Sequence, residues 1–255
     1  MTTPVTYSIQ TLNVISEHGL AQLPADRYEV TSATPAPDAI VLRSANLHHV
    51  EIPESVLAIA RAGAGTNNIP IAAMTARGVP VFNTPGANAN AVKELVLAGT
   101  LLMARNLFGA ALYVRGLEGT DDEIAHAAEV GKKKYVGYEL PGRTMGVIGL
   151  GAIGVQVANA ALSLGLKVVG YDPLITVRHA WQLSSDVERA DSIEDVLRVC
   201  DFVTVHVPLV DSTRNLIDAD RLKLMKRTAL LMNFARGEIV DSDAVVEALD
   251  AGQLG

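Results

Sequence analysis

Short apolar runs alternate with segments of helical periodicity in the second half of the chain. Runs of strand length lie at residues 145–149, 167–171, 202–207 and 229–233, and helical spacing is found over residues 152–164 and 244–249. Strands that alternate with helices are typical of a parallel sheet covered on both sides. This half of the chain therefore predicts a doubly wound α/β domain.

The first 90 residues show the same alternation on a smaller scale. Residues 5–12, 39–42 and 79–82 have the length of buried strands. Pro80 weakens the last of these because proline cannot donate a ladder hydrogen bond. We therefore expect a small α/β domain over residues 1–90 and a second domain over residues 91–255.

Two helices are predicted outside the second sheet. Residues 53–61 carry apolar side chains at helical spacing, and Asn90 offers an N-cap for a helix over residues 91–105. The second helix is apolar nearly all round over residues 95–103, so it must be covered on most sides, between domains or at a subunit interface. The polar, glycine-containing residues 116–142 predict a connector.

Composition and charge narrow the class of protein. Of the 255 residues 49% are hydrophobic and 19% are charged, which is typical of a globular chain. The net charge of −7 disfavours a nucleic-acid partner, and we interpret Lys132-Lys133-Lys134 as a solvated loop. Cys200 is the only cysteine and is expected to be a buried thiol. Without a basic start before an apolar stretch, or an apolar run of membrane length, we expect a soluble, cytoplasmic protein.

The motif Gly149-Leu150-Gly151-Ala152-Ile153-Gly154 follows a predicted strand and opens a predicted helix. In this context the first glycine permits a tight turn, the second admits a pyrophosphate, and the third lets helix and strand pack closely. The pyrophosphate would lie on the helix N-terminus, where backbone N–H groups point outward. A structural glycine turn without a ligand is the alternative.

Asp172 stands at the end of the next strand, at the position where an acid binds the ribose hydroxyls of a dinucleotide. Its charge would repel the 2′-phosphate of NADP, and no arginine stands directly beside it. The sequence therefore predicts NAD as the cofactor. A solvated aspartate is the alternative interpretation.

Five motifs occur in a characteristic order along the chain. They are Arg61-Ala62-Gly63-Ala64-Gly65, Asn83-Thr84-Pro85-Gly86-Ala87-Asn88, Gly146-Val147-Ile148-Gly149-Leu150-Gly151, His206-Val207-Pro208-Leu209 and Asn233-Phe234-Ala235-Arg236-Gly237. This succession resembles the D-2-hydroxyacid dehydrogenase family, and most of all its phosphoglycerate dehydrogenases, from about Val5 to Gly255. The resemblance implies a flavodoxin-like substrate domain followed by a Rossmann NAD-binding domain. It also implies oxidation of 3-phospho-D-glycerate to 3-phosphohydroxypyruvate in serine biosynthesis, or action on another 2-hydroxy or 2-oxo acid such as D-lactate or glyoxylate.

The resemblance also assigns roles to particular residues. Arg236 matches the catalytic arginine, whose planar guanidinium binds the substrate carboxylate in two places. The backbone N–H groups of Ala64 and Gly65 match those that receive the carboxylate, and Arg43 and Ser44 match a turn near the phosphate end. The remaining matches on the cofactor side, besides the three glycines and Asp172, are Ala152, Ile153, His206, Pro208, Thr213 and Ala235.

Two departures from the family pattern limit what the resemblance implies. Thr66-Asn67-Asn68 carries an asparagine where the family commonly has an aspartate, which puts the finer geometry of this loop in doubt. The family's glutamate–histidine pair lies beyond the arginine, and none of the six histidines of this chain matches it. We therefore expect a Rossmann domain truncated at its C-terminus, with an exposed sheet edge; a non-catalytic NAD-binding module is the alternative if the chain ends at Gly255. We expect a homodimer that needs no metal.

Overall fold

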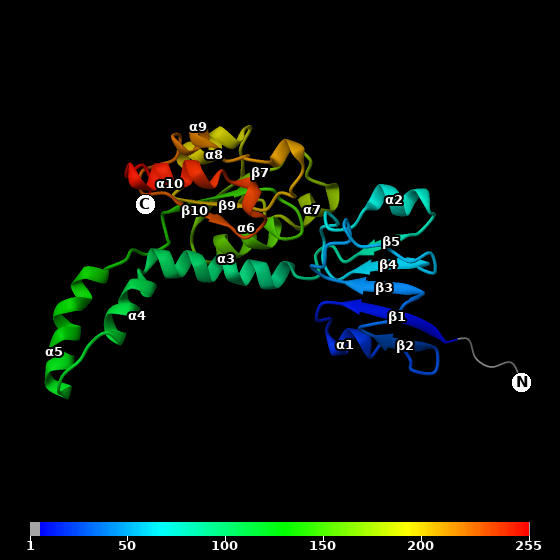
Figure 1. The fold of residues 1–255 in the computed structure, drawn as a ribbon. Helices are drawn as coiled ribbons and strands as arrows, with labels where there is room; N and C mark the ends of the chain where they lie inside the picture. The colour runs from blue at the N-terminus through cyan, green and yellow to red at the C-terminus, as the bar shows by residue number, and fades with distance from the viewer. Residues whose placement is uncertain (1–5, 255) are drawn as a thin grey trace, which may run out of the picture. The chain divides into compact units, whose positions relative to one another are not determined.

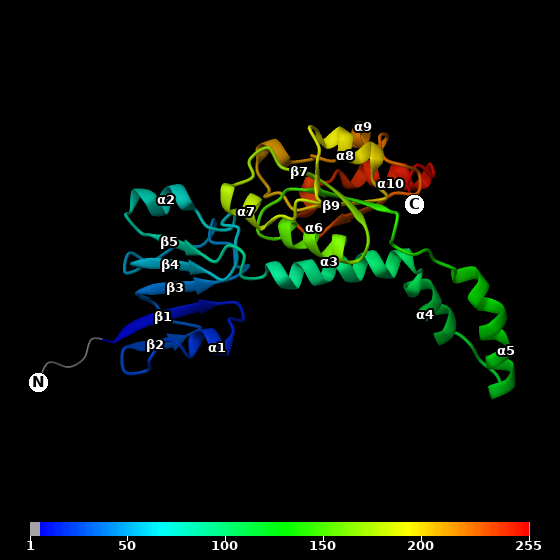
Figure 2. The same ribbon diagram turned by 180° about the vertical axis from the view of Figure 1, so that it is seen from behind.

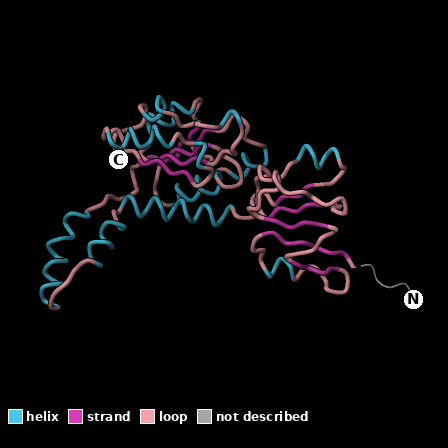
Figure 3. The backbone as a smooth tube through the Cα atoms, viewed as in Figure 1, coloured by secondary structure: helices cyan, strands magenta, loops and turns pink. Residues whose placement is uncertain are grey.

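The structure of the chain is a computed structural model that describes residues 6–254. Val5, the first residue of the predicted strand 5–12, and Gly255 lie outside the described residues. The chain divides into two compact units, Met1–Asn88 and Ala89–Gly255. Each unit contains its own parallel sheet, as Figures 1 and 3 show.

The first unit is a five-stranded parallel sheet in the order β2-β1-β3-β4-β5. The order reverses between β1 and β3, as in flavodoxin-like folds, so the predicted fold class is confirmed here. Apolar side chains of β3, β4 and α2 form its core, with Leu42 and Ile59 fully buried. The elements of this unit are β1 (Tyr7–Leu12), α1 (Glu17–Leu20), β2 (Tyr28–Thr31), β3 (Ala39–Leu42), β4 (Ala58–Arg61), α2 (Ile71–Ala76) and β5 (Val81–Asn83).

The helix predicted over residues 53–61 is wrong, because the second half of this segment is strand β4. In β4, Ile59 pairs with Ile40 of β3 and with Val81 of β5. A segment this short forms a marginal helix, whereas a central strand gains hydrogen bonds on both sides and buries its apolar residues. Pro80 precedes β5, which lies at the edge of the sheet where the missing N–H costs least.

The second unit contains a five-stranded parallel sheet in the order β10-β9-β6-β7-β8, in which the order reverses between β6 and β9. Figures 1 and 2 show α8, α9 and α10 on one side of this sheet and α6 and α3 on the other. Each side has its own apolar core, one containing Val196 and Leu222 and the other Val157 and Phe202. The doubly wound arrangement confirms the predicted Rossmann fold.

The elements of this unit follow each other along the chain without long interruptions. They are α3 (Ala89–Ala104), α4 (Leu107–Arg115), α5 (Asp121–Gly131), η1 (Lys132–Tyr135), β6 (Thr144–Ile148), α6 (Gly154–Ser163), β7 (Lys167–Tyr171), α7 (Val177–Gln182), β8 (Glu188–Arg189), α8 (Ile193–Val199), β9 (Phe202–Val205), η2 (Asp211–Thr213), α9 (Ala219–Leu222), β10 (Leu230–Asn233), η3 (Gly237–Ile239) and α10 (Ser242–Asp250).

Asn90 is not the N-cap that the sequence predicted. Helix α3 begins one residue earlier, at Ala89, so Asn90 lies inside its first turn. There its side chain bonds side chains one turn ahead instead of an orphan backbone N–H, with Nδ2 2.7 Å from Glu94 Oε1 and Oδ1 2.6 Å from Lys93 Nζ.

The connector predicted over residues 116–142 contains a helix and a 3-10 turn. Helix α5 begins at a capping box in which Thr120 and Glu123 bond each other's backbone N–H groups. The Thr-x-x-Glu spacing was visible in the sequence, and the polar character of the segment obscured it. The lysine run predicted as a loop is exposed but forms η1 at the end of α5.

Helices α3, α4 and α5 leave much apolar surface exposed. On α3, Val96 and Thr100 are buried, but Leu95 and Leu102 are 55% and 45% exposed. Helices α4 and α5 lie side by side beyond the end of α3 (Figures 1 and 2), and α4 has no buried residue. Among the described residues no single helix is long and apolar enough to cross a membrane; α3 and α4 reach that length only together, with a bend of 68° between them.

Candidate functional site

The glycine turn lies where strand order reverses in the second sheet, between β6 and β9. Gly149 has φ +94°, and a Cβ at this residue would approach the carbonyl carbon of His206 to 2.8 Å. A Cβ on Gly154 would collide with the carbonyl oxygen of Gly149. A Cβ on Gly151 would meet nothing within 4 Å. The first and third glycines are therefore needed by the fold, whereas Gly151 leaves open space above the turn.

The amides of this turn are left free for a ligand. In the part of the chain that the structure describes, the N–H groups of Gly151, Ala152 and Ile153 donate to no protein acceptor. They precede the first turn of α6, so the positive end of the helix adds to their attraction for an anion. Free amides beside an open approach fit the pyrophosphate of a dinucleotide.

Asp172 follows β7 and holds the turn from its other side. Its carboxylate accepts from Leu150 N and from Leu174 N, both at 2.8 Å. A carboxylate can accept about four hydrogen bonds, so it retains capacity for ribose hydroxyls. The predicted cofactor residue is thus also a structural anchor of the glycine turn.

A cavity of about 320 Å³ opens beside Asp172. Its wall is largely apolar where Leu150, Ile175 and Val187 line it, and Glu188, Arg189 and Asp191 supply charge. This size and lining fit an adenosine moiety. The wall after β7 could not be predicted from the sequence, because β8 has only two residues and the segment around it shows no periodicity.

His206 directly follows β9 and lies beside the glycine turn. Its backbone N–H donates to Ile148 O at 2.7 Å, and its Nε2 lies 3.0 Å from Thr204 Oγ1. Nδ1 is buried without a partner among the described residues, so the imidazole is only half satisfied. Burial lowers the pKa of His206 to about 4, which keeps the ring neutral at neutral pH.

Residues 206–216 form the loop after β9 and carry the other matches on this side. Thr213 Oγ1 donates to Pro208 O at 2.6 Å and accepts from Val210 N at 2.9 Å. The hydroxyl of Thr213 therefore closes the loop on itself and fixes the exposed Pro208. This internal role was not predicted from the sequence.

Arg236 is exposed on the loop that follows β10. Asn233 shapes this loop, since its Nδ2 donates to Arg236 O at 2.7 Å and its Oδ1 accepts from Ala235 N at 3.0 Å. Arg236 Nη1 lies 2.8 Å from Ala235 O, which leaves its other donors unused among the described residues. Because β10, β9 and β6 are neighbours, the loop of Arg236 shares one sheet edge with His206 and the glycine turn.

In the first unit, Arg43 and Ser44 form an exposed turn after β3 whose backbone N–H groups are all bonded. Asn13, which follows β1 with φ +74°, accepts from Arg43 N, Ser44 N and Ala45 N at 3.3, 2.9 and 2.7 Å. Asn68 Nδ2 donates to Ala45 O at 2.7 Å on the other side. The turn can therefore bind a ligand only through its side chains, because its amides are already bonded to Asn13.

The loop of Ala64 and Gly65, after β4, has the opposite arrangement. Asn83 Nδ2 donates to Ala64 O at 2.6 Å, and Arg61 Nη1 donates to Gly65 O. The amide nitrogens of Ala64 and Gly65 bond no acceptor in residues 6–254. Arg61 Nε also donates to Arg43 O at 3.0 Å, so one guanidinium joins this loop to the turn after β3. The structure thus brings the four predicted substrate-side residues together at one edge of the first sheet.

Two other expectations concern metals and the cysteine. No group of three histidine, cysteine or acidic side chains in residues 6–254 could hold a metal ion. Cys200 is fully buried, as expected, and burial raises the pKa of its thiol to about 12. The thiol is therefore unreactive and serves packing.

Family models and known relatives of this chain all point to one protein family. Residues 9–164 match the D-isomer specific 2-hydroxyacid dehydrogenase catalytic domain, and residues 108–255 match the NAD binding domain of the same family. The chain is 37% identical over 220 residues to a D-3-phosphoglycerate dehydrogenase of Methanocaldococcus jannaschii, covering 85% of this chain and 40% of the relative. It is 34% identical over 246 residues to a hydroxypyruvate reductase of Thermotoga maritima, covering 95% of this chain and 73% of the relative.

A solved structure supports the same assignment. The apo form of Rhodotorula graminis D-mandelate dehydrogenase aligns with a TM-score of 0.78 at 27% identity, covering 98% of this chain and 79% of that one. The chain spans 40% of the length of the Methanocaldococcus relative. One family assignment accounts for both domain matches, for the fold of both units and for the free amides of the glycine turn. The chain belongs to the D-isomer specific 2-hydroxyacid dehydrogenase family, and its cofactor is NAD.

Proposed function

We propose that this chain carries the cofactor-binding and substrate-binding parts of a dehydrogenase that oxidises 3-phospho-D-glycerate to 3-phosphohydroxypyruvate. NAD, when bound, supplies the hydride acceptor for C2 of the acid. The residues of the glycine turn and Asp172 would hold the dinucleotide, and Arg236 would bind the substrate carboxylate and the oxygen on C2. A guanidinium suits that role because it stays charged and binds two oxygens at once.

The observation that carries this proposal is the contrast between two neighbouring loops of the first unit. The free amides of Ala64 and Gly65 suit a carboxylate. The amides of Arg43 and Ser44 are taken by Asn13, so that turn can offer only a guanidinium and a hydroxyl. Two separate anion-binding devices suit a substrate with a carboxylate at one end and a phosphate at the other.

A second candidate is a dehydrogenase for a 2-hydroxy acid without phosphate, such as lactate, or a glyoxylate or hydroxypyruvate reductase. The relative from Thermotoga maritima favours it, since this chain covers 73% of a protein named hydroxypyruvate reductase. Such substrates have one anionic group, so they would use the amides of Ala64 and Gly65 but would gain little from Arg43.

Substrate preference and the Arg43→Ala variant separate these candidates. NAD reduction is measured with phosphoglycerate, D-lactate, glycerate and glycolate on protein of verified mass. For phosphoglycerate we expect Arg43→Ala to raise KM about 10- to 100-fold, the loss of a charge-assisted hydrogen bond, and to change the other acids less than about twofold. Arg27→Ala is the matched control, because Arg27 is exposed at the opposite end of the strands of the same sheet. A KM for phosphoglycerate that Arg43→Ala leaves unchanged would contradict the proposal.

We also propose that the protein is a homodimer formed through α3 and α4. Phe108 and Leu112 of α4 are 70% and 55% exposed, and Leu95 and Leu102 of α3 continue the apolar surface. Monomeric proteins rarely expose a contiguous apolar surface of this kind. Light scattering during size-exclusion chromatography tests this, and a monomer at micromolar concentration would refute it.

A further inference from the structure

The loop after β9 (residues 206–216) ends against the loop that carries Arg236. Asn215 N donates to Glu238 O at 2.8 Å, and Ile217 N donates to Ile239 O at 3.1 Å. Asn215 has φ +49°, a sharp bend that asparagine tolerates better than most residues. These two hydrogen bonds join the two loops, although about 20 residues separate them along the chain.

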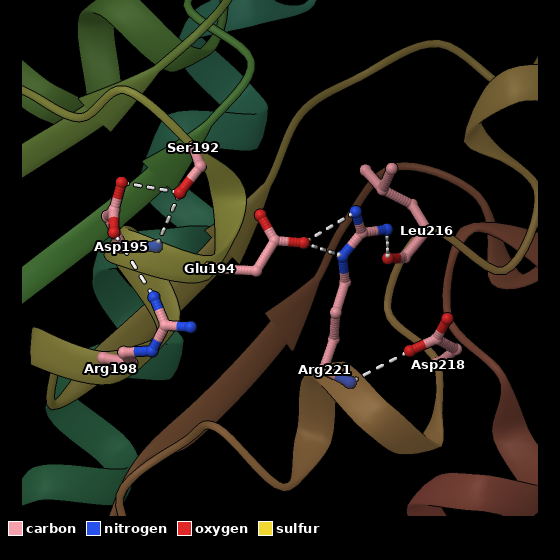
Figure 4. Close-up of polar contacts among 7 residues, drawn as sticks. All are labelled: Ser192, Glu194, Asp195, Arg198, Leu216, Asp218 and Arg221. Atoms are coloured by element: carbon pink, nitrogen blue, oxygen red, sulfur yellow. Dashed lines mark hydrogen bonds and ion pairs between the residues drawn. The ribbon is translucent and has the colours of Figure 1, made fainter.

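Arg221 of α9 bonds the end of the loop after β9 at Leu216, as Figure 4 shows. Its Nη1 donates to Leu216 O at 2.7 Å. Its Nε and Nη2 lie 3.0 and 2.9 Å from Oε1 of Glu194 on α8. The side chains of Arg221 and Glu194 are 28% and 35% exposed, so water screens the pair only in part.

The geometry makes Glu194 the residue that orients the guanidinium. Asp218 Oδ1 accepts from Arg221 N at 2.9 Å and caps α9, which fixes the backbone of Arg221. The guanidinium is rigid and planar, so two bonds to Glu194 aim the remaining nitrogen at Leu216 O. The backbone amide of Glu194 and the Arg221 guanidinium hold the pKa of the Glu194 carboxyl below its usual value, so the carboxylate stays charged.

We propose that Glu194 and Arg221 are positioning residues for the loop after β9 and, through Asn215 and Glu238, for the loop of Arg236. The inference rests on the proposed function, in which these two loops carry Thr213 on the cofactor side and the substrate-binding arginine. Neither Glu194 nor Arg221 is among the residues that would hold the cofactor or the substrate. They set the position of the backbone in the two loops that carry such residues.

A second ion pair on α8 provides a matched control. Arg198 Nη1 lies 3.3 Å from Asp195 Oδ1, one turn apart on the same helix, and these side chains are 54% and 51% exposed. Figure 4 shows Asp195 of this pair bonded to Ser192 at the start of α8, and within residues 6–254 neither Asp195 nor Arg198 has a hydrogen bond or ion pair with either loop. Arg198→Met thus removes an exposed arginine of α8 that bonds neither loop; its only link to the tested pair is its charge, a minor cause of the lowered pKa of Glu194.

The experiment compares Arg221→Met, Arg221→Lys and Arg198→Met in the full chain. Amide hydrogen exchange is measured over residues 206–217 and 236–241, and NADH affinity is measured by energy transfer from Trp181, the only tryptophan. For Arg221→Met we expect exchange in both segments to rise about tenfold, and NADH to bind several-fold more weakly, from the loss of charge-assisted bonds. Arg221→Lys should give exchange rates and NADH affinities between those of Arg221→Met and the unchanged protein, because an ammonium keeps the charge but cannot reproduce the planar fork of the guanidinium. Arg198→Met should change neither quantity.

The pattern of exchange distinguishes a positioning role of Arg221 from a general structural role. Exchange that rises equally over the whole second unit would assign Arg221 a general structural role and overturn the proposal. Exchange that rises in residues 206–217 alone would overturn its extension to Arg236. If Arg221→Met does not fold, Arg221→Lys and Glu194→Gln carry the same comparison. If the unchanged protein does not bind NADH, the proposed function fails, while the exchange measurement still decides the positioning role.

Discussion

Alanine substitutions at two glycines of the glycine turn should separate the predicted cofactor binding from folding. A Cβ on Gly151 would meet no atom within 4 Å, so Gly151→Ala costs the apo fold little. The space it would occupy is the approach to the free amides, where the pyrophosphate is expected. A Cβ on Gly154 would collide with the carbonyl oxygen of Gly149, so Gly154→Ala must displace backbone.

The structure sets the size of each effect. Gly151→Ala should keep Tm within about 2 °C, because a surface change away from contacts costs less than about 0.5 kcal/mol. Displacing the pyrophosphate from one or two charge-assisted hydrogen bonds weakens NADH binding about 10- to 100-fold. Gly154→Ala overpacks a rigid contact at a cost of about 1–3 kcal/mol, a fall in Tm of about 3–10 °C for a unit of this size.

The assay measures Tm without cofactor and NADH affinity by energy transfer from Trp181 for each variant. Gly19→Ala is the control, since Gly19 lies in α1 of the first unit with open space around its Cβ. It should change neither quantity appreciably. Gly151→Ala protein that binds NADH as tightly as the unchanged chain would refute the assignment of the pyrophosphate site. Equal losses of Tm in the two turn variants would refute the steric argument.

Three further outcomes follow from the structure. Asp172→Asn should reduce the preference for NAD over NADP, because it removes the charge that repels a 2′-phosphate. Tm should also fall by about a few degrees, since Asn Oδ1 can keep only part of the bonding to Leu150 N and Leu174 N. An unchanged preference in paired NAD and NADP titrations would count against Asp172 as the ribose-binding residue. Burial lowers the pKa of His206 to about 4, so between pH 6.5 and 4 the unfolded chain binds one more proton than the folded chain, and the free energy of unfolding falls as the pH drops. In urea titrations at several pH values, the free energy of unfolding of His206→Leu should depend less on pH in this window. An equal pH dependence in both proteins would contradict the lowered pKa of His206. Phe108→Glu on α4 should convert the proposed dimer to a monomer in light scattering, whereas Val136→Glu, a substitution of an exposed residue outside α3 and α4, should not.

Hydrophobic periodicity predicted the regular elements that pack against a sheet. Strands β3 and β7 have the predicted bounds, and the glycine motif lies at the end of β6 as expected. The helix predicted over residues 53–61 failed because the segment is short enough to fit either period. Its pairing with β3 and β5, which no local pattern reveals, decided in favour of a strand.

The candidate site could be predicted only where a motif marks it. Gly149, Asp172 and Arg236 stand at motif positions, and the structure places them at the carboxyl ends of strands in one sheet. The contacts that shape the site join distant residues: Asn13 bonds the turn of Arg43 across 30 residues of sequence, and Arg221 bonds Glu194 across 27. No spacing rule connects such partners, because the topology of the sheet alone makes them neighbours.

The same construction recurs at the edges of both sheets and explains how they are prepared for anions. After β1 and β7, the side chains of Asn13 and Asp172 accept the amides of one adjoining turn. In the first sheet the neighbouring loop at Ala64 keeps its amides unpaired, and in the second the amides that follow Leu150 in the glycine turn itself stay unpaired, while nearby side chains or helix turns fix the backbone. An anion that binds there pays little ordering entropy, since the donors are already in place. Selective satisfaction of neighbouring amides therefore predicts where each sheet would bind a negative charge.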